Sequence, residues 1–331
     1  EISACLVGSE MCIRDSFKAG STNAVVLAGM CTALAVVLSM IGLYMPLFST
    51  IVFLLIPLPI AYLGMREGIQ WSVIVTSGIL ILDSVFFGIV SAAFLCAIFG
   101  ILGIVMGICY KHKIAAWKAL IAGAVVVLIA LVAEGLAALY VLGISSPILG
   151  GEGFTQMEQS MNEMLPSFYS GEALTQAQER VDVMMESIRK SIPFAMVAAS
   201  FFYSWASMTL GKMIFQKMGI KDIPMLPALE RWEMPRPVLY VYIAVVVAGY
   251  FLKPQGMMDY VLYNVEVGCV LIFWLQGLAT LWWMPHKYPR VRPFRVLIVL
   301  LSFFVGLFQM MMVFLGMADM AVNYRKKRNY Q

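Results

Sequence analysis

The sequence has little charge and almost no histidine. Only 13% of its 331 residues are charged, whereas 61% are hydrophobic. The two histidines, His112 and His286, lie far apart in basic loops with no carboxylate or thiol at ligand spacing, so we expect no metal site built on histidine. A chain of mean hydropathy +0.86 is too apolar for a soluble fold, and we expect an integral membrane protein.

Motifs of common enzymes and nucleotide-binding proteins are also missing. The sequence has no HExxH, no GxSxG, and no P-loop, because GGEG at 150–153 lacks the following Lys-Ser or Lys-Thr. Asp83 is the one aspartate deep in an apolar run, which argues against a two-aspartate intramembrane protease. We therefore expect no enzyme activity and no cofactor. The basic loops are short and explained by membrane topology, so we expect no nucleic acid partner.

Residues 1–16 differ in character from the rest of the chain. They resemble a translated sequencing-adapter read-through, and a short polar leader is the alternative. We interpret 17–331 as a single integral membrane domain. The cysteines within it all lie in or at the end of apolar runs, where cysteine behaves as a small hydrophobe: Cys31, Cys96, Cys109 and Cys269.

Long apolar runs are what the sequence has in abundance. A helix needs roughly 20 residues to cross the hydrocarbon core, and no alternating pattern of about ten residues recurs to suggest a barrel. We predict an all-α polytopic transmembrane helix bundle of about eight or nine spans. The runs cover 24–44, 47–65, 69–88, 90–109, 117–141, 192–216, 237–252, 259–283 and 295–317.

Lysine and arginine in the loops predict the orientation of the spans. They cluster at three junctions that alternate to the same side, which the positive-inside rule makes cytoplasmic: 111–118, 217–236 and 287–295. Nine crossings from a cytoplasmic N-terminus would place the basic residues 325–328 outside. Either the last run folds back around Gly306, or the second run is broken by Pro57 and Pro59 and does not cross. We favour eight crossings with both ends inside.

The opposite face carries one long acidic insertion at about 142–191. Seven acidic residues there outweigh three basic ones, and helical spacing appears after Val181. We expect an exposed loop with one or two short amphipathic helices. A lid over an outward-facing site and a solvated connector both remain open.

Three carboxylates, Asp83, Glu134 and Glu266, lie inside separate apolar runs. Counting about 1.5 Å per residue, each falls in the outer half of its span, roughly 7 to 10 Å below the surface. Acids buried in lipid are costly unless protonated or paired with a cation. We predict an outward-facing substrate-binding pocket for a cationic or strongly hydrogen-bonding small solute, or an ion, completed by Asn264 and Tyr263. Two alternatives stay open: protonated acids that bond neighbouring helices, or a proton or ion relay.

Small residues at every fourth position form a second pattern. Ala24, Ala28 and Thr32 repeat along the first run, and Gly103 and Gly107 along the fourth. Such spacing lets helix backbones approach closely, either inside the protein or against a partner.

Three stretches resemble the YybS-like family of multi-pass bacterial membrane proteins. They are IPLPIAYLGMREG at 56–68, ERWEMPRP at 230–237 and LGMADMAVNYRKKR at 315–328, the last with Gly316, Asp319 and Arg325 in the expected order. The resemblance implies a bacterial cytoplasmic membrane protein. No biochemical function comes with the family.

The first half of the chain is also similar to the substrate-binding subunits of energy-coupling-factor vitamin transporters. It has a small-residue first helix, a proline-containing second and a glycine-rich fourth. The similarity implies a six-helix core that captures a solute on its outer side and rides on a transmembrane coupling protein and ATPases. Ala24, Ala28 and Thr32 would then be the partner-docking face. We predict a solute-binding or uptake subunit. A membrane scaffold or regulator that binds a protein is the alternative, and an enzyme on a lipid-linked substrate comes third.

Overall fold

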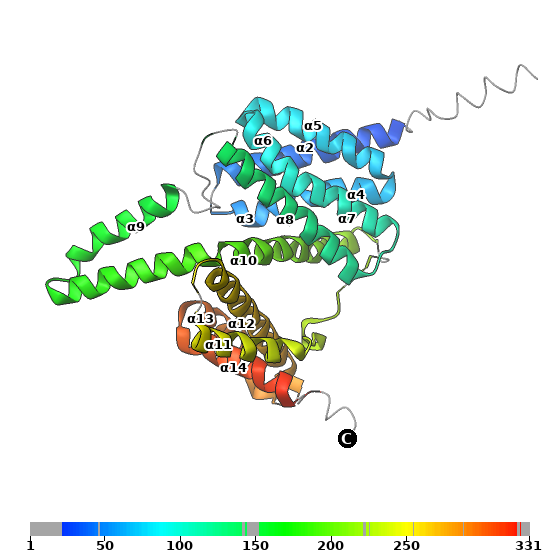
Figure 1. Cartoon of the computed structure of the whole chain (residues 1–331). Helices are drawn as coiled ribbons and strands as arrows, with labels where there is room; N and C mark the ends of the chain where they lie inside the picture. The colour runs from blue at the N-terminus through cyan, green and yellow to red at the C-terminus, as the bar shows by residue number, and fades with distance from the viewer. Residues whose placement is uncertain are drawn as a thin grey trace, which may run out of the picture. The chain divides into compact units, whose positions relative to one another are not determined.

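The computed structural model describes residues 22–45, 47–140, 143, 152–220, 223–224, 226–253, 255–286, 288–322 and 325. Within these ranges every regular element is helical (Figure 1), so the predicted all-α bundle is confirmed. Seven of the described helices are long and apolar enough to span a membrane, and a bent pair brings the number to eight. The chain divides into two compact units, residues 1–134 with 199–225 and residues 135–198 with 226–331.

Unit 1 contains most of the N-terminal spans. Its core is formed by apolar side chains of five spans together with the second half of α10, as Met208 and Phe215 show. The elements are α2 (Thr22–Tyr44), α3 (Ser49–Phe53), α4 (Pro57–Arg66), α5 (Ile69–Phe87), α6 (Ile89–Leu95), η1 (Cys96–Gly100), α7 (Ile101–Lys111), most of α8 (Ala116–Tyr140) and the end of α10 (Glu172–Lys217).

Proline breaks the second span without removing it from the membrane. Helix α3 ends at Phe53 and α4 begins with Pro57, which lacks the N–H that a helix interior needs but suits a first turn. The two pieces together, Ser49–Arg66, are still long and apolar enough to cross. The sequence left two explanations for the odd number of apolar runs: the second run does not cross, or the last run folds back. The structure gives no support to the first.

Glycines on α7 allow its close packing against α4. A Cβ at Gly103 would lie 2.8 Å from the Pro57 carbonyl oxygen, and one at Gly107 would lie 3.1 Å from the Ala61 carbonyl oxygen. The predicted close approach of helix backbones along the Gly103 and Gly107 row thus occurs inside unit 1, as small residues permit in lipid.

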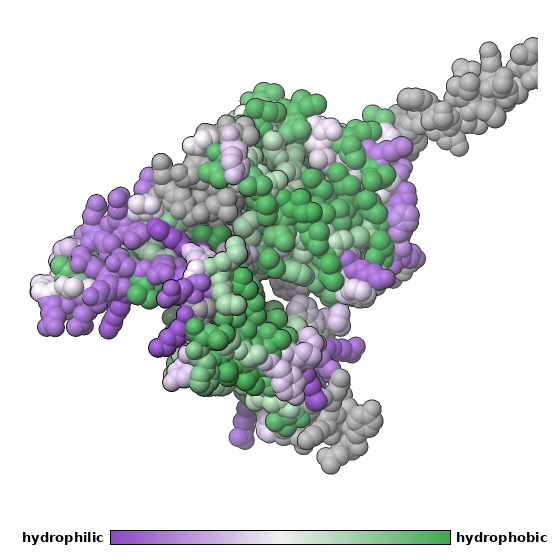
Figure 2. All heavy atoms as spheres, in the orientation of Figure 1, coloured by the Kyte–Doolittle hydropathy of each residue, from purple (hydrophilic) through white to green (hydrophobic). Residues whose placement is uncertain are grey.

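Unit 2 contains the acidic insertion and the C-terminal spans. Its elements are α9 (Glu152–Met164), η3 (Leu165–Ser167), the first part of α10, η4 (Leu229–Arg231), α11 (Pro237–Leu252), α12 (Met257–Trp283), η5 (Met284–His286), η6 (Pro289–Val291), α13 (Arg295–Phe304) and α14 (Gly306–Val322). The insertion forms α9 and the start of α10, which lie side by side as a hairpin (Figure 1) and carry mostly hydrophilic residues (Figure 2). An ion pair of 2.9 Å joins Arg189 to Glu158 across it.

The tightest helix contact in unit 2 is between α12 and α14. A Cβ on Gly277 would overlap the Met312 carbonyl oxygen, and a Cβ on Gly316 would overlap the Phe273 carbonyl oxygen. Only glycine fits either position, because the two backbones touch there.

The last apolar run is broken at Gly306. Helices α13 and α14 meet at 117° around Val305, whose backbone is extended. A fold-back at this glycine was one of the two explanations expected for the basic C-terminal residues, and the break is present where it was expected.

Candidate functional site

Asp83 is the most deeply buried of the three predicted acids. It lies near the end of α5 in unit 1 with an exposed fraction of 0%. Among the described residues, neither of its carboxylate oxygens has a hydrogen-bond partner, because the nearby Ser39 hydroxyl donates to the Ala35 carbonyl oxygen. A carboxylate in this position is either protonated or balanced by a bound cation, because an isolated charge in an apolar interior is costly.

A small hollow adjoins Asp83. It is lined by residues of α2, α4, α5 and the fourth span; about 190 Å³ of space lies between the atoms, and no part of it admits a water-sized sphere. Its polar lining includes the Ser39 hydroxyl, which donates to the Ala35 carbonyl oxygen at 3.1 Å, and the Cys96 thiol, which contacts the Thr76 carbonyl oxygen at 3.8 Å. One hydroxyl and one thiol thus lie beside the carboxylate, and the remaining lining residues are aliphatic except for Gly100.

The fourth span changes helical form beside this hollow. Between α6 and α7, Cys96–Gly100 adopts a π-helical turn, and both Cys96 and Gly100 line the hollow. Single π-turns inside α-helices recur at functional sites, because they redirect side chains and loosen the backbone hydrogen bonding.

The other predicted acids are less buried and are divided between the units. Glu134 lies half-buried on α8 in unit 1, whereas Glu266 lies half-buried on α12 in unit 2, together with Tyr263 and Asn264. The convergence of all three acids on one pocket therefore stays a prediction. Among the described residues, no three His, Cys, Asp or Glu side chains cluster closely enough to hold a metal ion.

Asn264 bridges two backbone groups of α10 beside Pro193, which lies inside this helix. The Phe194 N–H donates to its Oδ1 at 2.9 Å, and its Nδ2 donates to the Lys190 carbonyl oxygen at 2.7 Å. In a regular helix these two backbone groups would bond each other, but Pro193 lies between them and disturbs the helix. The Nδ2 also donates to the Tyr260 carbonyl oxygen at 2.7 Å. These bonds occupy most of the amide, so its predicted role as a solute ligand would compete with the bridge.

The predicted docking row on α2 faces the interior of unit 1. Ala24 and Ala28 are buried with exposed fractions of 1% and 6%. Thr32 contacts α5, where a Cβ at Gly78 would lie 3.1 Å from its methyl group. Within unit 1 this row already packs against neighbouring helices, and docking of a partner through it stays a prediction.

A buried polar cluster in unit 2 was not assigned any role by sequence reasoning. Asp319 on α14 accepts at Oδ2 from Gln276 Nε2 at 2.6 Å and from Arg325 Nε at 2.9 Å. All three residues are buried, with exposed fractions of 3% to 6%. Thr280 donates to the Gln276 carbonyl oxygen at 2.8 Å. We refer to Gln276, Asp319 and Arg325 as the polar clasp.

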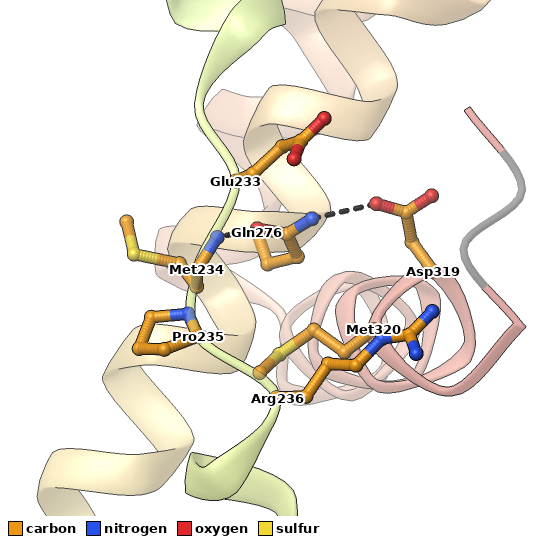
Figure 3. A pocket seen from close by; sticks show the side chains of 7 residues that line it. All are labelled: Glu233, Met234, Pro235, Arg236, Gln276, Asp319 and Met320. Carbon is orange, nitrogen blue, oxygen red and sulfur yellow. Dashed lines mark hydrogen bonds between the residues drawn. The ribbon is translucent and has the colours of Figure 1, made fainter. Parts of the chain in front are cut away.

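The polar clasp holds the segment 230–236, which we call the elbow. Arg325 donates to the carbonyl oxygens of Glu230 and Trp232, both at 2.8 Å. The Met234 N–H donates to Gln276 Oε1 at 2.9 Å (Figure 3). The fork of guanidinium donors thus satisfies backbone groups that no helix or strand would satisfy.

A pocket of about 410 Å³ lies where the elbow meets α12 and α14. Figure 3 shows its lining side chains, which come from the elbow (Glu233, Met234, Pro235 and Arg236), from α12 (Gln276) and from α14 (Asp319 and Met320). The sequence did hold a signal for this site, because the ERWEMPRP and LGMADMAVNYRKKR stretches that meet here were two of the three that carried the family resemblance.

These features define a polytopic helical membrane protein with buried carboxylates in each unit. The chain belongs to the family described as predicted membrane protein (DUF2232), whose model matches residues 33–320. It is 24% identical over 313 residues to the Uncharacterized protein YybS of Bacillus subtilis (strain 168), covering 92% of this chain and 98% of that protein. The YybS-like resemblance is thereby confirmed. No solved structure matches the chain.

Proposed function

We propose that this protein is a solute-binding component of an uptake system in the bacterial cytoplasmic membrane, and that Asp83 is its binding group. The solute, or the part of it that reaches Asp83, is a small cation. The observation that carries the proposal is a fully buried side chain whose two carboxylate oxygens have no hydrogen-bond partner in the part of the chain that the structure describes. An ionisable group inside a membrane-spanning segment lowers the stability of the protein, and such groups usually have a function.

The make-up of unit 1 supports this proposal. It contains six apolar helical segments, namely α2, α3 with α4, α5, α6 with α7, α8 and the end of α10. Six is the number implied by the similarity to the energy-coupling-factor substrate-binding subunits. We extend the proposal to the partners of those subunits, a transmembrane coupling protein and ATPases, which would supply the energy for uptake.

The size of the hollow limits which ligands can bind without a conformational change. Its space of about 190 Å³ is divided between side chains and does not admit a water-sized sphere. A bare ion with oxygen ligands suits such a site, as hard cations prefer carboxylate, hydroxyl and carbonyl oxygens. A larger solute would require the helices around the π-helical turn to separate.

Thermal unfolding in detergent tests the proposal. The purified full chain is heated with chloride salts of lithium, sodium, potassium, ammonium and methylammonium at constant ionic strength. A cation that binds only the folded state raises the unfolding temperature as its concentration passes the dissociation constant. We expect one of these cations to stabilise the wild type, and Asp83→Asn to weaken its apparent affinity by roughly tenfold or more.

Two further variants make the result specific. Asp182→Asn removes an exposed acid of α10 and should leave the response unchanged. Glu134→Gln reports whether the second acid of unit 1 contributes to the same site. If no cation stabilises the wild type, or if Asp83→Asn responds as the wild type does, Asp83 serves helix packing and the proposal is wrong.

A further inference from the structure

The pocket beside the elbow in unit 2 is lined by charges of both signs. Asp319 and Glu233 bring carboxylates to it, and Arg236 brings a guanidinium (Figure 3). At about 410 Å³ it is large enough for a small polar molecule. It is a separate site from the hollow beside Asp83, which belongs to unit 1.

Two of the groups in this region have unused hydrogen-bonding capacity. Asp319 Oδ1 is buried and has no hydrogen-bond partner among the described residues, although Oδ2 of the same carboxylate accepts two hydrogen bonds. The Arg236 guanidinium makes no hydrogen bond or ion pair with any residue that the structure describes. A buried acceptor without a donor costs free energy, so a ligand that supplies an N–H would be favoured.

The mixture of charges selects the chemistry of the ligand. Arg325 already balances the charge of Asp319, so the groups open to a ligand are the Arg236 guanidinium, which suits an anionic group, and Asp319 Oδ1, which suits an N–H donor. A zwitterion supplies both, with its anionic group on the Arg236 guanidinium and its ammonium against Asp319. The ammonium must carry N–H bonds, because a trimethylated one has no hydrogen to donate to Asp319.

The position of the pocket indicates where such a ligand comes from. Arg236 immediately precedes α11, an apolar helix, and Trp232 lies within the elbow. Tryptophan and arginine at the start of an apolar helix are typical of the headgroup level of a membrane, and the loop is basic, as on a cytoplasmic side. We propose that this pocket binds the headgroup of a zwitterionic phospholipid that carries a phosphate and a primary ammonium, as phosphatidylethanolamine does.

Lipid retention by the full chain tests this proposal. The protein in detergent is incubated separately with phosphatidylethanolamine, phosphatidylcholine and phosphatidylglycerol of the same acyl chains, and bound lipid is counted by native mass spectrometry. We expect phosphatidylethanolamine to bind roughly tenfold more tightly than the other two, because only it offers both a phosphate and an N–H donor. Arg236→Ala should weaken the binding of all three lipids, because it removes the partner of the phosphate that they share, and Arg236→Lys should retain part of the affinity.

Arg231→Ala is the matched control. Arg231 is an exposed arginine in the same elbow but does not line the pocket, so its removal should leave both the affinity and the preference intact. Arg236 is also exposed, so loss of its side chain should not unfold the protein, which circular dichroism checks.

A soluble analogue of the headgroup distinguishes a lipid ligand from a free one. If phosphoethanolamine raises the unfolding temperature as much as phosphatidylethanolamine does, the pocket binds a free zwitterion, and the proposed binding site still holds. Equal binding of phosphatidylcholine, preference for phosphatidylglycerol, or an unchanged affinity for phosphatidylethanolamine in Arg236→Ala would each overturn the proposal. None of these results depends on the response of Asp83 to cations.

Discussion

Arg325 and Asp319 form the one described ion pair in which both side chains are more than nine-tenths buried, with exposed fractions of 7% and 4%. The pair does not stand alone, because Gln276 and two elbow carbonyl groups complete its hydrogen bonds. A buried pair contributes little net stability against an apolar replacement, but removing one partner leaves the other charge uncompensated.

Arg325→Gln should therefore destabilise the protein by about 3 kcal/mol. The change leaves Asp319 buried without its counter-charge and frees the elbow carbonyl groups. Denaturant unfolding in detergent measures the free energy, with Arg292→Gln as the control because Arg292 is exposed on a basic loop. Arg325→Lys should recover only part of the loss, since lysine cannot reproduce the planar fork. Equal stability of Arg325→Gln and Arg292→Gln would contradict the structural role of the polar clasp.

The polar clasp shows why sequence reasoning found some site residues and not others. Asp83 stands out because it interrupts an apolar run, where any acid is conspicuous. Arg325 lies among the basic residues that the positive-inside rule already explains, and Gln276 is uncharged. Their joint role depends on contacts between residues far apart in the chain, 43 positions for Gln276 with Asp319 and 95 positions for Arg325 with Glu230 of the elbow, which no local pattern encodes.

At the scale of elements, the helices of this protein contain breaks at defined residues. Pro57 starts α4, Pro193 interrupts α10, and Gly306 separates α13 from α14. Proline and glycine are the residues that break helices, and backbone groups freed at membrane depth need other partners. Asn264 supplies those partners at Pro193.

Asn264→Leu should destabilise the protein by about 2 to 4 kcal/mol, because the Phe194 N–H and the Lys190 carbonyl lose their partners in an apolar setting. In a Pro193→Ala background the helix can form its own backbone hydrogen bonds. Asn264→Leu should then destabilise the protein by at most half as much. Unfolding free energies of the four proteins form a double-mutant cycle. Additive effects of the two changes would show that the amide does not serve the proline break.

At the scale of the whole molecule, charge and hydropathy predict sidedness. The hairpin of α9 and α10 is rich in acids, whereas the loop at 287–295 is rich in arginine. The fold-back at Gly306 would let the chain end on the same side as that loop. We therefore expect the C-terminus and Arg292 on the cytoplasmic side and Glu179 on the other.

Cysteine labelling in intact cells checks this topology. In a variant without native cysteines, Glu179→Cys should react with a membrane-impermeant maleimide. Arg292→Cys and a cysteine added after residue 331 should react only once the membrane is permeabilised. A C-terminal cysteine that reacts from outside would mean that α13 and α14 together cross the membrane.

The class of this protein follows from composition and period alone. In lipid every backbone group must form its hydrogen bonds within its own segment, so long apolar runs without barrel periodicity are helices. The charge of each loop then predicts the side of the membrane on which it lies. The approximate ends of the spans, the break at Gly306 and the conspicuous acid in α5 are all local properties of this kind.

The partners of each buried polar group are not local properties. Which hydroxyl and thiol surround Asp83, which amide closes the break at Pro193, and which arginine binds the elbow depend on how helices remote in sequence pack together. That packing rests on contacts such as Gly277 with Met312, where the backbones touch. In lipid, helix association is driven by close fit and hydrogen bonds instead of hydrophobic burial, and fit is a property of the folded chain.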